Sequence, residues 1–283
     1  MSKNLKAPTS VGVIISTYNN PKWLELVLWG YTCQTYSDFE LLIADDGSKE
    51  ETRALIERFQ TKTSLKIKHI WQEDNGFQKS QILNKAIVHS VSEYLIFTDQ
   101  DCIPRKDFVE KHLQFAKTGY FLSGGYFKLP MSISNMVSKE NIEDGSIFKL
   151  KWLFERGLKK SFKCSKLWNS RVWSAIMNFI TPAAASWNGC NASGWKADFL
   201  VINGFNQDMQ YGGQDREFGE RLWNAGLHSK QIRYTAICLH LDHKRPYKTV
   251  ETMKKNKSIR KETKTMKRTW TPNGITNSKG GVS

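Results

Sequence analysis

An apolar run that stops abruptly at two carboxylates is the feature that most constrains this fold. Residues Tyr94 to Thr98 are bulky and mostly apolar, and Asp99-Gln100-Asp101 follow at once. Such a run predicts a strand buried on both faces, as in a parallel sheet. Ligands of open α/β sheets bind beyond the carboxyl ends of these strands. There, a D-x-D pair can hold a hard divalent cation and through it a diphosphate, although an isolated D-x-D is more often a solvated turn.

Two earlier apolar runs end in the same way. Residues 11–16 run into a polar turn around Tyr18, and residues 39–44 run into Asp45-Asp46. Apolar residues at helical spacing follow each run, at 21–34 and 49–60, and a further strand at 65–71 precedes a helix at 78–90. This alternation predicts an α/β fold with a doubly wound parallel sheet. Right-handed crossovers place the acidic strand ends along one edge, where they make one site.

Composition is typical of a soluble enzyme. A length of 283 residues fits one large domain or two closely joined halves. No run approaches the roughly 18 apolar residues of a membrane span, and no stretch of signal-peptide kind precedes the first strand. The five cysteines are scattered without a C-x-x-C pair. That pattern favours reduced thiols in the cytoplasm over a disulfide or zinc framework.

The charge is strongly basic and unevenly placed. The 42 Lys and Arg against 27 Asp and Glu give a net charge of +15. Residues 149–171 contain eight basic residues, one acidic residue and interleaved aromatic residues, and a second basic block covers 244–268. No nucleic-acid module motif is present, so no nucleic-acid partner is expected. An anionic membrane surface is the favoured partner of these basic segments. For the tail, a merely solvated basic face is an equally good interpretation. After Thr271 the tail also has the composition of a partly disordered segment.

Together these motifs resemble the nucleotide-binding half of family-2 GT-A glycosyltransferases, inverting enzymes that use nucleotide-sugar donors. The matching pieces are V-G-V-I-I-S-T-Y-N-N-P, Q-T-Y-S-D-F-E-L-L-I-A-D-D-G-S and Y-L-I-F-T-D-Q-D-C-I-P. Further on, N-G-C-N-A-S-G-W, N-G-F and Y-G-G-Q-D-R-E-F resemble the acceptor-side segment of chondroitin-polymerase-like and galactosyltransferase-like members. The resemblance covers roughly two thirds of the chain, and the ordered set of motifs is far more specific than any one of them.

This resemblance implies a GT-A fold, in which a Rossmann-like, mostly parallel sheet flanked by helices joins a smaller acceptor-side part. Residues 1–104 are expected to form the nucleotide-sugar binding half. Residues 105–245 are expected to form the acceptor-binding and catalytic half, including a basic aromatic insert near 146–173. Residues 246–283 form a basic tail that we expect to associate with a membrane or to be disordered.

The donor site is expected at the ends of the first strands. By the resemblance, Ser16 and Tyr18 contact the base, Tyr18 by stacking, Asp46 accepts hydrogen bonds from uracil or ribose, and Asp99 faces the ribose. An Asx-turn that caps the following helix is the competing explanation for Asp46. Lys79 stands at a predicted helix start, where a cation opposes the helix dipole. That position suggests a phosphate or base contact, although a surface lysine is equally compatible with it.

The metal site is expected to bind Mn²⁺ or Mg²⁺ through Asp101, so that the cation stabilises the departing nucleotide. Residues 232–239 have the pattern of a strand, and C-L-H-L-D-H closes it. Since related enzymes place a histidine after a similar strand, His240 is the first choice for a further ligand. His243 is the alternative.

The catalytic base of an inverting transfer must take the proton of the acceptor hydroxyl. Asp215 in the G-G-Q-D segment is the candidate, with Glu217 second, because the preceding glycines let the backbone approach the sugar closely. Family members usually carry Glu at position 214, where this chain has Gln214. Acidic residues that merely stabilise a helix start remain the alternative. Three residues are candidates for a sugar-stacking platform, although tryptophans are also ordinary core residues: Trp187, Asn191 and Trp195.

The predicted function is transfer of a hexose or N-acetylhexosamine from a UDP-sugar to a glycan or lipid-linked saccharide. Surface polysaccharide or lipopolysaccharide synthesis, at the cytoplasmic face of the inner membrane, is the expected setting. A Mg²⁺-dependent nucleotidyltransferase is the first alternative, but it needs a Gly-rich, basic phosphate loop that residues 16–20 do not provide. A non-catalytic sugar- or membrane-binding protein is the second, which the intact D-Q-D and G-G-Q-D make less favoured.

Overall fold

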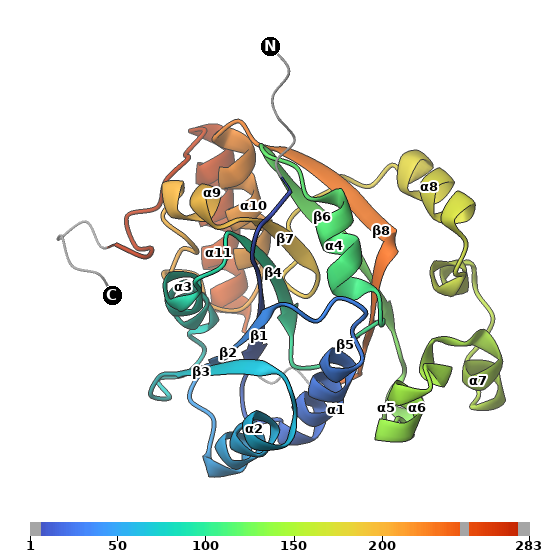
Figure 1. The fold of residues 1–283 in the computed structure, drawn as a ribbon. Coiled ribbons are helices and arrows are strands. Elements are labelled where there is room, and N and C mark those ends of the chain that lie inside the picture. Colours follow the sequence, from blue (N-terminus) through green and yellow to red (C-terminus); the bar gives the residue numbers. More distant parts are fainter. Residues whose placement is uncertain (1–6, 244–248, 277–283) are drawn as a thin grey trace.

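A mixed sheet runs through the whole molecule (Figure 1). The computed structural model describes residues 7–243 and 249–276. The strands in this part of the chain are β1 (Val11–Thr17), β2 (Glu40–Asp45), β3 (Lys66–Trp71), β4 (Tyr94–Asp99), β5 (Cys102–Pro104), β6 (Tyr120–Lys128), β7 (Ala192–Trp195) and β8 (His228–His240). They form an eight-stranded sheet in the order β3-β2-β1-β4-β7-β6-β8-β5.

Helices lie on both faces of this sheet, and α5 to α8 lie beyond its β8 and β5 side (Figure 1). The α-helices are α1 (Pro21–Thr32), α2 (Glu50–Lys62), α3 (Lys79–His89), α4 (Phe108–Phe115), α5 (Met131–Ser134), α6 (Lys139–Glu143), α7 (Leu150–Glu155), α8 (Arg171–Ile180), α9 (Lys196–Val201), α10 (Gln214–Asn224) and α11 (Val250–Thr265). Two 3₁₀ helices are η1 (Ser146–Phe148) and η2 (Phe162–Leu167). None of the described helices is long and apolar enough to cross a membrane.

The first four strands are parallel and confirm the predicted alternation of strands and helices. β1 lies between β2 and β4, and in this register Ser16 stands opposite Asp99 while Thr17 stands opposite Asp45. The carboxyl ends of the three strands are therefore level at one edge of the sheet. Between β1 and β2, α1 starts where expected, because Asn20 accepts a hydrogen bond from the Trp23 amide and Pro21 occupies the first turn.

Two apolar cores, one on each face, explain why these strands are apolar without alternation. Val13 and Ile15 of β1 belong to a core built with α1, α2 and α4. Ile14 belongs to the opposite core, built with α3, α9 and α10. Because both faces are covered, every residue of β1 and β2 is buried.

Beyond β4 the sheet changes direction, so it is mixed rather than purely parallel. β7 pairs antiparallel with β4 and with β6, β6 pairs parallel with β8, and β5 pairs antiparallel with β8. Cys102 thereby stands opposite His240, and the Leu241 amide donates to the Asp101 carbonyl. The end of β8 is fixed directly beside the D-Q-D turn.

The basic aromatic insert and the C-terminal tail are both folded in the described part of the chain. The insert forms η1, α7, η2 and the start of α8. In the tail, α11 packs against α10, and Ile275 is buried in the core beside α9 and α10. Residues 249–276 of the tail are thus ordered in the structure, and the alternative of membrane association stays a prediction. The remainder of the predicted tail, 246–248 and 277–283, lies outside the described residues.

Candidate active site

A pocket of about 890 Å³ opens at the carboxyl ends of β1, β2 and β4. Its wall also includes the start of α3, the start of α10 and the end of β8. Nine of the predicted site residues line it: Ser16, Tyr18, Asp46, Lys79, Asp99, Asp101, Asp215, His240 and His243. The fold thus brings together residues from six separate segments of the chain.

Asp99 is held by two donors at the floor of the pocket. Ser16 Oγ donates to Asp99 Oδ1 at 2.7 Å, and Lys79 Nζ donates to the same oxygen at 2.6 Å. Burial by itself lowers the pKa of the Lys79 ammonium, but the carboxylates of Asp99, Asp215 and Asp101 outweigh it and raise that pKa. Lys79 therefore stays charged. A positive charge at a helix start is unfavourable because of the helix dipole. The nearby carboxylates of Asp99, Asp215 and Asp101 compensate for this and explain the position of Lys79.

Asp46 lies in a more enclosed place beside Tyr18. Its two oxygens accept from Gln72 Nε2 at 2.7 Å and from the Gln78 amide at 2.8 Å. Burial raises the pKa of Asp46 to about 6, although both hydrogen bonds oppose the shift. The Tyr18 hydroxyl donates to Asp74 at 2.8 Å, which raises the pKa of the phenol. Asp46 and Tyr18 together form a polar and aromatic wall that suits a nucleobase.

The tip of the D-Q-D turn is tied back to the end of β1. The Tyr18 amide donates to Gln100 Oε1 at 3.0 Å, and Gln100 Nε2 returns a bond to the Tyr18 carbonyl at 3.1 Å. This pair fixes the turn, so Asp99 and Asp101 on either side of Gln100 face the pocket in defined positions. Nothing in the sequence pattern predicts this role of Gln100.

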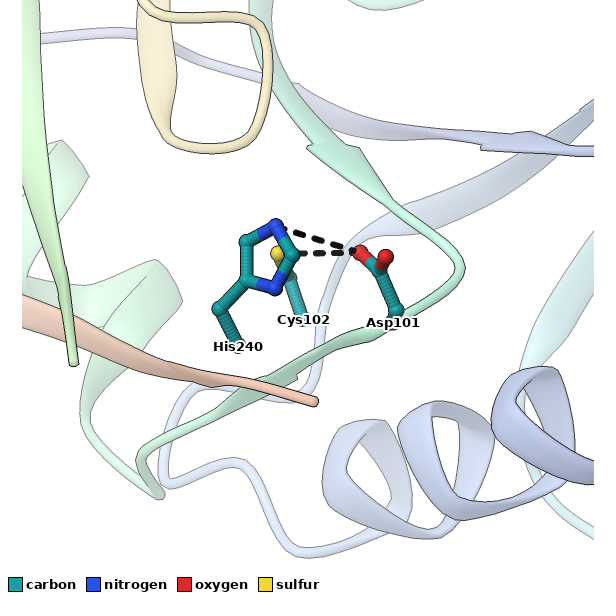
Figure 2. Close-up of side chains that lie close together, drawn as sticks. All are labelled: Asp101, Cys102 and His240. Atoms are coloured by element: carbon teal, nitrogen blue, oxygen red, sulfur yellow. Dashed lines mark hydrogen bonds and ion pairs between the residues drawn. The ribbon is translucent and has the colours of Figure 1, made fainter. Parts of the chain in front are cut away.

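Asp101 is surrounded by potential metal ligands (Figure 2). His243 Nε2 lies 3.0 Å from one Asp101 oxygen and His240 Nε2 lies 3.9 Å from the other. His240 Nδ1 lies 2.8 Å from the Leu241 carbonyl, which leaves Nε2 on the Asp101 side. The Asp101 carboxyl is buried, but hydrogen bonding to His243 and the two nearby imidazoles lower its pKa. The group holds a carboxylate beside two imidazole nitrogens.

Cys102 belongs to this cluster and was missed from the sequence. Its Sγ donates to Asp101 Oδ1 at 3.4 Å, and the ligand atoms of Asp101, Cys102 and His240 lie within 4.8 Å of one another. Burial raises the pKa of the Cys102 thiol, so it is protonated at neutral pH. The pairing of β5 with β8 brings Cys102 opposite His240. The only signal in the sequence is that Cys102 directly follows the D-Q-D turn.

Asp215 is half-buried at the first turn of α10, with its Oδ1 inaccessible to solvent. Its Oδ1 has no hydrogen-bond partner among the described residues, and Asp215 lines the pocket. Burial raises the pKa of Asp215, and the charge of Lys79 partly offsets this effect. Gly189 permits the close approach, because a Cβ there would lie 2.5 Å from Asp215 Oδ1. Gln214, beside it, accepts from the Gly212 amide at 2.8 Å and closes the glycine turn.

Glu217, the second candidate base, points away from the pocket. It is only 1% exposed and forms a bidentate ion pair with Arg221, at 2.7 and 2.9 Å. Thr263 of α11 donates to the same carboxylate at 3.2 Å. The assignment of Glu217 to catalysis is corrected: two positions beyond Asp215 on a helix, its side chain faces α11 and the protein interior.

The proposed sugar-stacking residues are also not in the pocket. Trp195 stands opposite Tyr94 at the far end of β4, because β7 runs antiparallel to it. Trp187 is buried in the core against Phe218. Asn191 is buried and donates to the Gly125 and Ala236 carbonyls. All three are structural residues. Phe77 and Tyr211 instead line the pocket, with ring centroids 5.8 Å apart and planes nearly perpendicular.

The family model of glycosyl transferase family 2 matches residues 12–172, more than half of the chain. The chain belongs to glycosyltransferase family 2. A second model, described as the N-terminal domain of galactosyltransferase, matches residues 177–244. The boundary between the two matches falls in α8, so the second covers α10 and the β8 end that carries His240.

Curated relatives of this family-2 chain are longer than it is. A validoxylamine A glucosyltransferase of Streptomyces hygroscopicus subsp. jinggangensis is 25% identical over 236 residues, which are 77% of this chain and 52% of the relative. A chondroitin synthase of Escherichia coli is 25% identical over 246 residues, which are 78% of this chain and 33% of that protein. The chain thus spans about half and about a third of these two relatives.

Solved structures share the fold of this chain. A mannosyltransferase of Pyrobaculum calidifontis, in complex with GDP-Man and Mn²⁺, superposes with a TM-score of 0.58 at 20% identity, covering 86% of this chain and 59% of the other. TarS 1–349 of S. aureus, in complex with UDP-GlcNAc, superposes with a TM-score of 0.57 at 16% identity, covering 84% and 60%. These neighbours confirm the predicted GT-A fold.

Proposed function

We propose that this chain transfers a hexose or N-acetylhexosamine from a UDP-sugar to a saccharide or lipid-linked saccharide, with inversion at the anomeric carbon. The observation that carries the proposal is the pocket at the sheet edge. It joins the D-Q-D turn, a histidine-containing cluster and the buried carboxylate of Asp215. The family match supports the same reaction class, and two structural neighbours are complexes with UDP-GlcNAc and GDP-Man.

The donor occupies the β1, β2 and β4 side of the pocket in this proposal. Tyr18 supplies an aromatic ring for the base, and Asp46 is an acceptor for an N–H group of uracil. Lys79 and Asp99 form an ion pair that a ribose hydroxyl and a phosphate can join. Each of these groups is already fixed by a protein partner, so donor binding requires little ordering of side chains.

Asp101 and His240 are proposed as metal ligands, and His243 is the alternative histidine. His240 lies beside Asp101 Oδ1 and His243 beside Asp101 Oδ2. The donor set fits a divalent transition metal: the imidazoles favour Mn²⁺ over Mg²⁺, which prefers oxygen ligands alone. When bound, such an ion supplies positive charge that neutralises the diphosphate of the leaving nucleotide. Cys102 lies at the same place, and its thiol would have to lose its proton to join these ligands.

Asp215 is proposed as the general base. It accepts the proton of the acceptor hydroxyl as that oxygen attacks the anomeric carbon and the nucleotide diphosphate departs. The raised pKa of Asp215 brings it nearer to that of a base that works at neutral pH. Its unpartnered oxygen leaves a hydrogen-bonding position open to the acceptor. Phe77 and Tyr211 offer aromatic surface for the sugars.

The remaining parts of the proposal concern organisation and setting. Residues 1–104 are the donor-binding half, and residues 105–245 are the acceptor-binding and catalytic half. Surface polysaccharide or lipopolysaccharide synthesis, at the cytoplasmic face of the inner membrane, is the proposed process. The strong positive charge supports contact with an anionic membrane surface.

Calorimetric titration with UDP tests the donor and metal assignments together. We expect UDP to bind in Mn²⁺ and to bind at least about tenfold more weakly in EDTA or in Asp101→Ala. His240→Ala should weaken Mn²⁺ binding with an effect that overlaps that of Asp101→Ala rather than adding to it. The control is Glu57→Ala, which removes an exposed carboxylate on α2.

Two results would contradict this assignment. Equal UDP affinity with Mn²⁺ and with EDTA would exclude a metal role. If His243→Ala weakens Mn²⁺ binding and His240→Ala does not, His243 is the metal ligand in place of His240. GDP and a panel of nucleotide sugars are titrated in parallel, so preference for GDP would overturn the uridine assignment. Release of pyrophosphate from a nucleoside triphosphate would favour the nucleotidyltransferase alternative.

A further inference from the structure

Helix α8 presents an apolar face that nothing in the described chain covers. Val172, Ile176, Phe179 and Ile180 lie at spacings of four, three and one, which places them on one side of the helix. All four are exposed, Val172 by 71% and Phe179 by 89%. Exposed apolar residues that occur singly are ordinary, but a contiguous face of this kind marks a contact surface.

The opposite face of α8 is anchored to β8, so the apolar face is held outward. Ser174 Oγ donates to the Tyr234 carbonyl at 2.7 Å. Asn178 Nδ2 donates to Thr235 Oγ1 at 2.8 Å, and Asn178 Oδ1 accepts from the Tyr234 amide at 3.0 Å. Met177 is buried beneath the helix. These contacts fix the orientation of α8, which stands at the edge of the molecule (Figure 1).

Aromatic residues of the preceding segment extend this face. Phe162 of η2 and Trp168 just after it are both exposed, and their rings pack against Trp173 of α8 at 6.5 and 5.0 Å between centroids. Tryptophan and phenylalanine beside a charged surface are characteristic of segments that lie in a membrane interface. The apolar surface therefore continues from η2 onto α8.

The segment of sequence that carries this face is basic. Residues 156–197 contain no aspartate or glutamate, and their seven basic residues are Arg156, Lys159, Lys160, Lys163, Lys166, Arg171 and Lys196. β8, against which α8 packs, likewise has no acidic residue. A second copy docked by two-fold symmetry on this face would bring like charges together, which disfavours self-association. An anionic surface is the complementary partner.

We propose that α8 and η2 dock on an anionic membrane surface, with the apolar face of α8 entering the interface and the surrounding lysines contacting lipid headgroups. The docking face lies close to the pocket, because Lys166 donates to the carbonyl of Tyr126, a pocket residue, at 3.3 Å. Docking in this way would turn this side of the proposed transferase toward the membrane. The docking itself does not depend on the proposed function; only the delivery of a lipid-linked acceptor to the pocket rests on it. The basic residues of α11 form a separate surface.

Sedimentation of the full chain with vesicles tests this surface. We expect binding to vesicles with about one third phosphatidylglycerol in phosphatidylcholine, and little binding to phosphatidylcholine alone. Val172→Ser with Phe179→Ser should reduce the partition coefficient at least about tenfold, because two apolar side chains leave the interface. Lys160→Ser, Lys163→Ser and Arg171→Ser together should reduce it by about fivefold for each charge.

The matched control is Lys254→Ser, Lys255→Ser and Lys257→Ser on α11, which removes the same charge from exposed positions elsewhere. We expect it to change binding about twofold at most. Equal losses in the two triple variants, or unchanged binding of the apolar variant, would overturn the proposal. So would a dimer, seen by analytical ultracentrifugation without vesicles, that the apolar variant dissociates.

Failure of this proposal can be told apart from failure of the proposed function. The vesicle assay contains no nucleotide or sugar, and the α8 variants lie outside the pocket. They should therefore keep the UDP affinity and the melting temperature of the wild type. Vesicle binding without UDP binding would retain the membrane surface and remove the transferase assignment, and the reverse result would do the opposite.

Discussion

At the scale of single residues, the site is a set of charges that already have partners. Lys79 balances Asp99, and Asp101 lies beside His240 and His243. Asp215 differs, because one of its oxygens is buried without a hydrogen bond. Buried polar atoms are nearly always satisfied in folded proteins, so such an exception facing a pocket indicates a place for a ligand.

Replacing Asp215 by Asn tests the base at this scale. Asn keeps the shape and hydrogen-bonding capacity of Asp but cannot accept the proton. We expect turnover to fall by about 10²-fold or more, while UDP affinity is retained. Steady-state kinetics and titration of UDP on the same preparation separate the two effects. Near-normal turnover would remove Asp215 from catalysis, and loss of UDP binding would move it to the donor or metal site.

Asp46 predicts a pH dependence of stability. Its pKa is about 6 in the folded protein and about 3.9 in an unfolded chain. Folding therefore favours the protonated acid, and this contribution is complete below about pH 4 and is lost as the pH rises through about 6. Relative to Asp46→Asn, the wild type should lose stability between these values.

Denaturant unfolding of both proteins between pH 4 and pH 7.5, in EDTA, measures this difference. Asn cannot accept from both Gln72 and the Gln78 amide, so the absolute difference also contains a lost hydrogen bond. The pH dependence of the difference is therefore the diagnostic quantity. A difference that stays constant would show that Asp46 titrates normally.

At the scale of elements, helix α10 gives two neighbouring acidic residues opposite roles. Asp215 in the first turn faces the pocket, and Glu217 pairs with Arg221 one turn later, at the interface with α11. The glycine turn before α10 is held from the same side, because Asn256 of α11 donates to the carbonyls of Tyr211 and Gly212. The C-terminal helix therefore supports the segment that presents Asp215.

Glu217→Ala should destabilise the fold rather than disable chemistry. It leaves the Arg221 guanidinium buried without its carboxylate, which costs about 3–5 kcal/mol. Glu57→Ala is the matched control, since Glu57 forms an exposed ion pair with Arg53 at the same i, i+4 spacing, worth at most about 0.5 kcal/mol. Equilibrium unfolding in urea gives both values. Equal effects of the two substitutions would contradict a structural role for Glu217.

At the scale of the whole molecule, one sheet assembles the site from both ends of the chain. The parallel strands β1, β2 and β4 bring Ser16, Asp46 and Asp99 to one edge, and β8 returns to place His240 opposite Cys102. Because β5 and β8 pair directly, the D-Q-D turn and the histidines are fixed by backbone hydrogen bonds. The metal and donor parts of the pocket therefore depend on the same sheet.

The sequence by itself determined the parallel half of the fold and most of the pocket. Strands buried on both faces are apolar throughout, and polar residues at their carboxyl ends must meet at one edge, so Ser16, Asp46 and Asp99 followed from local pattern. The antiparallel return of β7, the pairing of Cys102 with His240 and the burial of Glu217 were decided by tertiary structure. These depend on which distant segments pack together, and neither strand direction nor the partner of a charged side chain is encoded in local spacing.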